Sequence, residues 1–328
     1  MRPQQLRRRL RNWLLAVAVV ALGGCAATGL RPALESSSVE RQVELAATPF
    51  YPQEKYQCGP AALATSLGAI GIEAAPDKLV DEVYVPARKG SFQIEMLAAA
   101  RRNGAVAFVL PDRIDALLAE LAAGNPVLVL LNLGLSWIPS WHYAVAIGYD
   151  LDRGEIVLRS GTTARQVMSL NTFMHTWNRS DRWAFVALPP GKLAVSADEQ
   201  ATQDATLAFA RLATTANARS AYYAALQRWP DNLPLAIGLG NAAYESGDLD
   251  GARQAFEAAS KTHPEDGAIL NNLAFILAKQ GHIAAARRTA RQALALGDRW
   301  RQEAQKTLDQ IESMTNAPGE GPKPKKQP

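Results

Sequence analysis

The chain has 328 residues, of which 48% are hydrophobic and 20% are charged. This composition excludes a wholly disordered chain, a collagen and a protein with many membrane spans, and the length allows two domains of roughly 100–200 residues. The net charge of +4 comes from five arginines before residue 25; without residues 1–24 the chain has 30 basic against 31 acidic residues. It therefore lacks the positive field of a nucleic-acid-binding protein, and its two cysteines exclude a scaffold of several disulfides.

Residues 1–24 have the layout of an export signal. An arginine-rich start is followed by the apolar run Trp13–Leu22, which is half as long as a membrane-spanning helix. The run ends in Leu22-Gly23-Gly24-Cys25, which resembles the lipobox of bacterial lipoproteins. The resemblance implies that Cys25 is lipidated and anchors the chain in the membrane, and Ala26 favours the outer membrane, facing the periplasm. An uncleaved anchor or an ordinary signal is the alternative.

The composition divides the rest of the chain into four segments. We expect a polar tether over residues 25–47, a domain over 48–190, a helical domain over 199–313 and a disordered tail over 314–328. Pro189-Pro190-Gly191 marks the end of the first domain, and a linker follows it. The lysines of the tail are interpreted as solubilising residues.

The helical domain contains a repeat with a period of 34 residues. Pro230-Asp231-Asn232 recurs as Pro264-Glu265-Asp266, and small residues recur at matching positions, such as Ala252 and Ala286. This pattern resembles tetratricopeptide repeats, in which pairs of helices pack at small residues and must stack to bury their apolar faces. The resemblance implies that the repeats recruit a substrate or a protein partner.

One glycine pair in this domain imitates a dinucleotide-binding motif. Gly238 and Gly240 have the spacing of such a motif, but no strand precedes them and they fall on repeat positions. We therefore expect a packing role and no nucleotide cofactor. The four histidines are widely scattered and give no metal site either.

The domain over residues 48–190 has a helical first half and a second half rich in Val, Ile and Leu. This order predicts an α+β domain with an antiparallel sheet. Helices are expected from Cys58, over 92–103 and over 172–178, and strands over 127–133, 142–149, 155–159, 166–170 and 183–188.

Two residues of this domain point to thiol chemistry. Cys58 opens a helix, where the free amides and the partial positive charge favour a thiolate, and His142 begins a strand. A cysteine at a helix start with a distant histidine on a strand is the arrangement used in nucleophilic catalysis by a thiol. The alternatives are a buried structural cysteine and a histidine at a strand edge. Trp137 and Trp141 are expected in the core or in the wall of a cleft.

The two motifs together resemble a known family. Cys58-Gly-Pro-Ala-Ala-Leu-Ala with His142-Tyr-Ala-Val-Ala-Ile-Gly-Tyr-Asp150 looks like the bacteriocin-processing, double-glycine-leader cysteine peptidases of the papain-like clan. With the lipobox and the repeats, the chain is also similar to a group of bacterial lipoprotein cysteine peptidases. The resemblance implies a papain-like fold over about residues 48–188, Cys58 as nucleophile and His142 as base. It also implies an oxyanion-hole glutamine, for which Gln53 is preferred to Gln57.

One position departs from the family. Ser160 ends the strand after the histidine strand, where the family has Asp and papain relatives have Asn. A hydroxyl can orient the histidine but brings no negative charge to stabilise an imidazolium ion. We therefore expect a weak triad, a dyad or an inactive relative. A peptide-binding scaffold without turnover and another acyl transfer, such as amidase or transpeptidase chemistry, remain open beside the peptidase.

Overall fold

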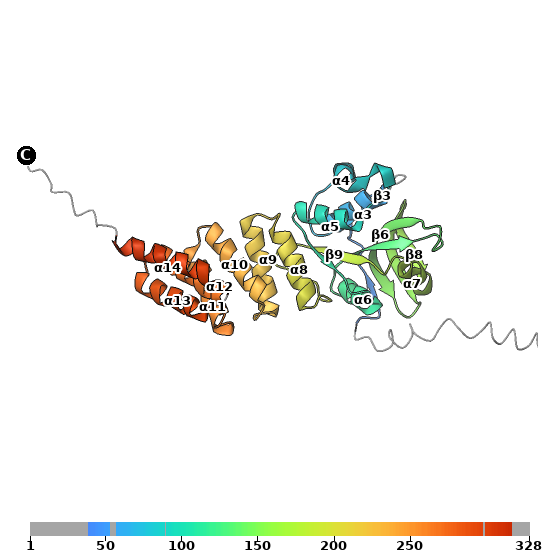
Figure 1. Cartoon of the computed structure of the whole chain (residues 1–328). Coiled ribbons are helices and arrows are strands. Elements are labelled where there is room, and N and C mark those ends of the chain that lie inside the picture. The colour runs from blue at the N-terminus through green and yellow to red at the C-terminus, as the bar shows by residue number, and fades with distance from the viewer. Residues whose placement is uncertain (1–38, 53–56, 89, 298, 317–328) are drawn as a thin grey trace, which may run out of the picture.

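The structure is a computed structural model that describes residues 39–52, 57–88, 90–297 and 299–316. A domain of helices and strands is followed by a stack of helices that extends from one side of it (Figure 1). The export signal, Cys25, Gln53 and the tail beyond Asn316 lie outside the described residues. Within the described ranges, no helix is both long and apolar enough to cross a membrane.

The first domain is built on a seven-stranded antiparallel sheet. Six strands follow in the order β4-β9-β5-β6-β7-β8, and β1 pairs with the far end of β6. The bounds are β1 Gln42–Glu44, β4 Val106–Val109, β5 Val127–Asn132, β6 Trp141–Asp150, β7 Glu155–Ser160, β8 Thr163–Ser169 and β9 Ala184–Leu188. A separate ribbon is formed by β2 Tyr84–Val85 and β3 Gly90–Ser91.

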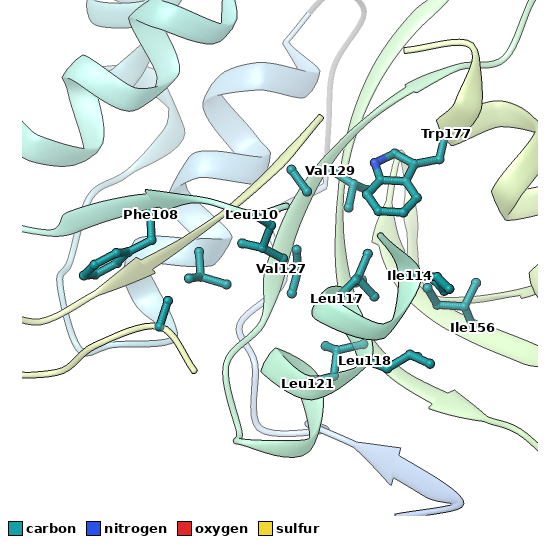
Figure 2. Packing of buried hydrophobic residues seen from close by; sticks show 14 of the residues in the cluster. Phe108, Leu110, Ile114, Leu117, Leu118, Leu121, Val127, Val129, Ile156 and Trp177 are labelled. Atoms are coloured by element: carbon teal, nitrogen blue, oxygen red, sulfur yellow. The ribbon is translucent and has the colours of Figure 1, made fainter. Parts of the chain in front are cut away.

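Helices cover both faces of the sheet. One face carries α3 Cys58–Gly68, α4 Pro76–Val83 and α5 Gln93–Arg102, and the other carries α6 Ile114–Ala122 and α7 Leu170–Asn178. Because side chains alternate along a strand, Tyr143 and Val145 of β6 enter the core under α3, whereas Ala144 and Ala146 enter the core under α6 and α7. Figure 2 shows Leu117 and Leu121 of α6 packed with strand residues in this second core.

The expected α+β class is confirmed, but two strands of the large sheet and the short β2–β3 ribbon were missed. The tether expected over residues 25–47 is wrong at its end, because Gln42–Glu44 pair with Gly148–Asp150 as β1. An ion pair of 2.8 Å between Arg165 and Glu44 fixes this strand. β1 has only three residues and is mostly polar, so it has no strand signature. β4 was also missed, although it is a short apolar run after a helix-ending glycine.

The second domain consists of paired helices. Their bounds are α8 Glu199–Ala210, α9 Thr215–Arg228, α10 Leu233–Glu245, α11 Leu249–Thr262, α12 Gly267–Lys279, α13 Ile283–Leu296 and α14 Arg301–Asn316. A methyl group at Gly238 would overlap the ring of Tyr222, and one at Gly240 would overlap the ring of Phe256. These two glycines therefore allow helices to pack closely, as the repeat pattern predicts. α14 continues to Asn316, beyond the boundary expected at residue 313.

Both domains form hydrogen bonds with the linker that was expected between them. Glu120 of α6 is fully buried and accepts hydrogen bonds from the backbone N–H and the hydroxyl of Ser196, at 2.8 and 2.6 Å. Arg228 of α9 donates to the carbonyl of Ala194 at 3.0 Å. Phe209 of α8 is buried in the same core as the sheet residue Phe108. The first repeat helices are thus part of the hydrophobic core of the first domain.

Candidate active site

Cys58 lies at the first position of α3, as the sequence predicts. Pro60 fits the first helical turn because it needs no N–H there, and no acidic side chain lies in that turn to oppose a thiolate. The helix approaches β3 so closely that a methyl group at Gly59 would overlap the hydroxyl of Ser91. The cysteine is half-buried, so it remains accessible from solvent.

His142 and Ser160 are brought together at the ends of neighbouring strands. His142 is the second residue of β6, Ser160 is the last residue of β7, and His142 Nε2 lies 2.9 Å from Ser160 Oγ. The register between β7 and β8 shifts between Leu158 and Ser160, which is where Ser160 reaches the ring. With Nε2 held by the hydroxyl, Nδ1 is the nitrogen available for proton transfer.

The Cys58 sulfur lies against the strand that carries His142. The backbone amide of Tyr143, the next residue along β6, donates a hydrogen bond to the sulfur. Among the described residues, the His142 ring is hydrogen-bonded to Ser160 and not to Cys58. Catalytic hydrogen bonds are often long in a free enzyme and tighten once substrate is bound. The Cys58 and His142 side chains therefore come from the adjoining elements α3 and β6, but they are not hydrogen-bonded to each other.

Burial sets the protonation state of both groups. Burial raises the pKa of the Cys58 thiol, and the backbone amides of Tyr143, Gly59 and Cys58 offset only part of this rise. Burial also lowers the pKa of His142. The expectation of a thiolate favoured by the helix start is therefore wrong, because the loss of solvation outweighs the amides. Both shifts favour the uncharged forms of the two groups, a thiol and a neutral imidazole.

Tyr143 is a residue of the site that the sequence analysis missed. Its hydroxyl donates to the carbonyl of Ser91 at 3.1 Å, and its ring meets the edge of Trp183 at a centroid distance of 6.0 Å. Burial raises the pKa of its hydroxyl, so Tyr143 stays protonated as a donor. This hydrogen bond connects β6, the strand that carries His142, with the β2–β3 ribbon next to α3. The His-Tyr pair in the sequence was the signal that could have identified it.

The remaining candidates lie apart from the pair. Asp150 accepts hydrogen bonds from the backbone of Asp152 and Arg153 in the β6–β7 turn, and Asp152 pairs with Arg41 at the surface. Neither carboxylate orients His142. Gln57 precedes α3 without capping it through its side chain. No cluster of three or more metal-binding side chains occurs in the parts of the chain that the structure describes.

Comparisons with known proteins agree with this architecture. Residues 45–184 match the model of the Peptidase_C39 like family. These residues form a C39-like peptidase domain. Residues 213–264 and 243–311 match tetratricopeptide-repeat models, so the second domain is a repeat domain. The expected C39-like domain with tetratricopeptide repeats and the expected fold class are confirmed, whereas lipidation stays a prediction.

Solved structures are also similar to this chain. A putative C39-like peptidase from Bacillus anthracis is 18% identical with a TM-score of 0.40, and the match covers 47% of this chain and all of that one. MamA from MSR-1 is 15% identical with a TM-score of 0.29, and the match covers 38% of this chain and 81% of that one. Among curated proteins, no match was found.

Proposed function

We propose that the protein is a thiol peptidase in which Cys58 is the nucleophile, His142 is the base and acid, and Ser160 is a positioning residue. The contact of 2.9 Å between His142 and Ser160 supports this most strongly. It orients an imidazole at the strand that adjoins the helix start carrying a half-buried thiol. The C39-like fold makes peptides the expected substrates.

The reaction begins from a neutral pair. His142 Nδ1 takes the thiol proton while the Cys58 sulfur forms a bond to the peptide carbonyl carbon. The carbonyl oxygen becomes an oxyanion, for which the Cys58 backbone N–H at the helix start is a donor. We assign the second donor to Gln53. The imidazolium then protonates the amine, the carbon–nitrogen bond breaks, and water hydrolyses the thioester with His142 again as base.

Ser160 limits the rate of this reaction. The hydroxyl keeps the ring in place but offers no negative charge to the imidazolium that forms during attack. The same burial that lowers the pKa of His142 makes that imidazolium costly. We therefore propose a slow peptidase, and we propose that the repeats supply a specific substrate or partner and thereby compensate for the slow chemistry.

Cleavage of a peptide library tests this function. We expect the full chain to cleave peptides, and Cys58→Ala and His142→Asn to lose turnover by at least about a thousandfold. His175→Asn is the matched control, because His175 is exposed on α7. Cleavage by Cys58→Ala at the rate of the unchanged protein would refute the assignment.

A peptide-binding module without turnover is the second candidate. The raised pKa of the Cys58 thiol and the neutral Ser160 favour it, because both lower reactivity. Ser160→Asp separates the two functions, since a carboxylate can stabilise the imidazolium. A weak peptidase gains activity from this change, whereas a pure binding module shows none. Transfer of the acyl group to an added amine would indicate transpeptidase chemistry instead.

We also propose that Cys25 anchors the protein in the bacterial cell envelope, at the outer membrane and facing the periplasm. The lipobox-like sequence before Cys25 supports this. Two acyl chains make a stable anchor. We expect Cys25→Ser to move the protein from the membrane fraction to the soluble fraction, and an unchanged distribution would refute lipidation as the anchor.

A further inference from the structure

The loop between β5 and β6 exposes an unusual amount of apolar surface. Trp137 at its tip is 76% exposed, Ile138 is 67% exposed and Trp141 at the start of β6 is 55% exposed, and Leu133 and Leu135 are about half exposed. Residues 133–142 contain no Asp, Glu, Lys or Arg. Clustered apolar side chains in water mark a surface that binds something. We call residues 133–141 the apolar loop.

The apolar loop is held in one conformation. The buried side chain of Asn132 accepts hydrogen bonds from the backbone of Gly134 and Ser140, at 3.0 and 2.9 Å. Leu135 and Ile138 exchange two backbone hydrogen bonds of 3.1 Å, which makes a tight turn with Trp137 at its tip. A methyl group at Gly134 would overlap the carbonyl of Ile138. The exposed side chains are therefore presented by a fixed backbone.

The apolar loop adjoins the candidate active site. Trp141 is two residues before Tyr143 on β6, so both side chains lie on the sheet face that α3 covers. The Tyr143 amide contacts the Cys58 sulfur, so Trp141 lies two residues along β6 from the contact with the thiol. Ser91 lies over Gly59, and Ile94 three residues later, at the start of α5, is 71% exposed. Exposed apolar side chains thus occur on both segments that adjoin the start of α3.

We propose that the apolar loop binds apolar side chains of the peptide substrate next to the bond that is cleaved. This inference rests on the proposed peptidase function and adds the class of substrate. The absence of charge in residues 133–142 fits an uncharged, aliphatic or aromatic peptide segment. Because the backbone is already fixed by Asn132, binding does not have to order the loop.

A membrane is the other partner to which such a loop could bind. The chain enters the domain through β1, which pairs with Gly148–Asp150 at the far end of β6. Trp141 begins the same ten-residue strand, and at about 3.3 Å per residue the two ends lie roughly 30 Å apart. An anchor on the N-terminal side therefore attaches at the opposite end of the strand from the apolar loop. This arrangement favours a peptide over the membrane.

Binding to the full chain carrying Cys58→Ala tests the proposal without any turnover. The probes are a neutral labelled peptide rich in Leu and Phe and a counterpart of equal length in which Ser replaces them. Fluorescence anisotropy should show the apolar peptide binding at least about tenfold more tightly. Adding Trp137→Ser or Ile138→Ser should abolish most of this preference. Tyr223→Ser, an exposed ring on α9, is the matched control and should leave it unchanged.

Equal affinity for the two peptides, or a preference that survives both loop variants, would overturn the proposal. Co-sedimentation with phosphatidylcholine–phosphatidylglycerol vesicles is the second measurement. Weaker vesicle binding by Trp137→Ser, with the peptide preference intact, would assign the loop to the membrane instead. Because no bond is cleaved in either assay, a failure of the peptidase proposal leaves these results interpretable. If cleavage is observed, the loop variants should raise KM and leave kcat unchanged.

Discussion

The peptidase domain and the repeat domain obtain their packing in different ways. In the sheet, strands far apart in the sequence are neighbours: β4 pairs with β9, so that Val106 lies opposite Leu188. In the repeat domain, each helix packs on the next one along the chain, and small residues such as Gly240 set the spacing. A period in the sequence therefore specifies the repeats locally, whereas the site depends on a sheet that must assemble from distant segments.

Phe209 links the two domains, because it lies on a repeat helix and is buried in the core of the sheet domain. We expect Phe209→Ala to lower the free energy of unfolding by about 3–5 kcal/mol, since it removes a fully buried ring. Urea unfolding followed by circular dichroism measures this. Leu212→Ala, at an exposed position just after α8, is the control. A loss below about 1 kcal/mol would show that the two domains are energetically separate.

Gly240 tests whether the repeats are specified locally. Gly240→Ala should destabilise the repeat domain by about 1–3 kcal/mol, because the added methyl group meets the Phe256 ring. The exposed neighbour change Asn241→Ala should have little effect. At a helix position without such a contact, Gly→Ala stabilises by about 1 kcal/mol, so a gain in thermal stability would contradict this packing.

Ser160 tests the sheet domain through the contact that orients His142. Ser160→Ala should lower kcat about tenfold with KM unchanged, because His142 loses its hydrogen-bond partner and not the substrate. Ser160→Thr keeps a hydroxyl and should restore most of the rate. Thr163→Ala, opposite Ser160 on β8, is the control for a change in the sheet. Equal losses in Ser160→Ala and Thr163→Ala would indicate a structural role alone.

The smallest expected effect is the dependence of kcat/KM and of stability on pH. Since the pKa of His142 is lowered and that of Cys58 is raised, kcat/KM should increase with pH below about 6.5 and decrease only above about 8.5. The folded chain binds the His142 proton less tightly than the unfolded chain, so its stability falls as pH falls below about 6.5. His142→Asn should reduce that fall. A rate that declines through pH 7 would instead indicate an ion pair.

The sequence predicted the repeats better than it predicted the sheet. The 34-residue period and the motifs around Cys58 and His142 are local patterns, and the contact of Ser160 with His142 followed from the family resemblance. The position of β1 did not follow, because its three residues pair with a strand about a hundred positions later in the sequence.

Two electrostatic features of the structure also could not be predicted from the sequence. The helix start at Cys58 predicted a lowered pKa, but the depth of burial that raises it depends on residues packed around α3. Glu120 of α6 is fully buried and accepts a hydrogen bond from Ser196 of the linker, which no motif of the sequence indicated. Burial of a polar group depends on tertiary packing, which local composition does not contain.

The most direct test of the central claim is the rate at which a leucine peptide chloromethyl ketone alkylates Cys58 in the full chain, followed by mass spectrometry. If Cys58 and His142 act as a pair, the unchanged protein and His175→Asn should react at equal rates, and His142→Asn should react at least about a hundredfold more slowly. Equal rates in all three proteins would contradict a catalytic pair and leave Cys58 as a cysteine of the core.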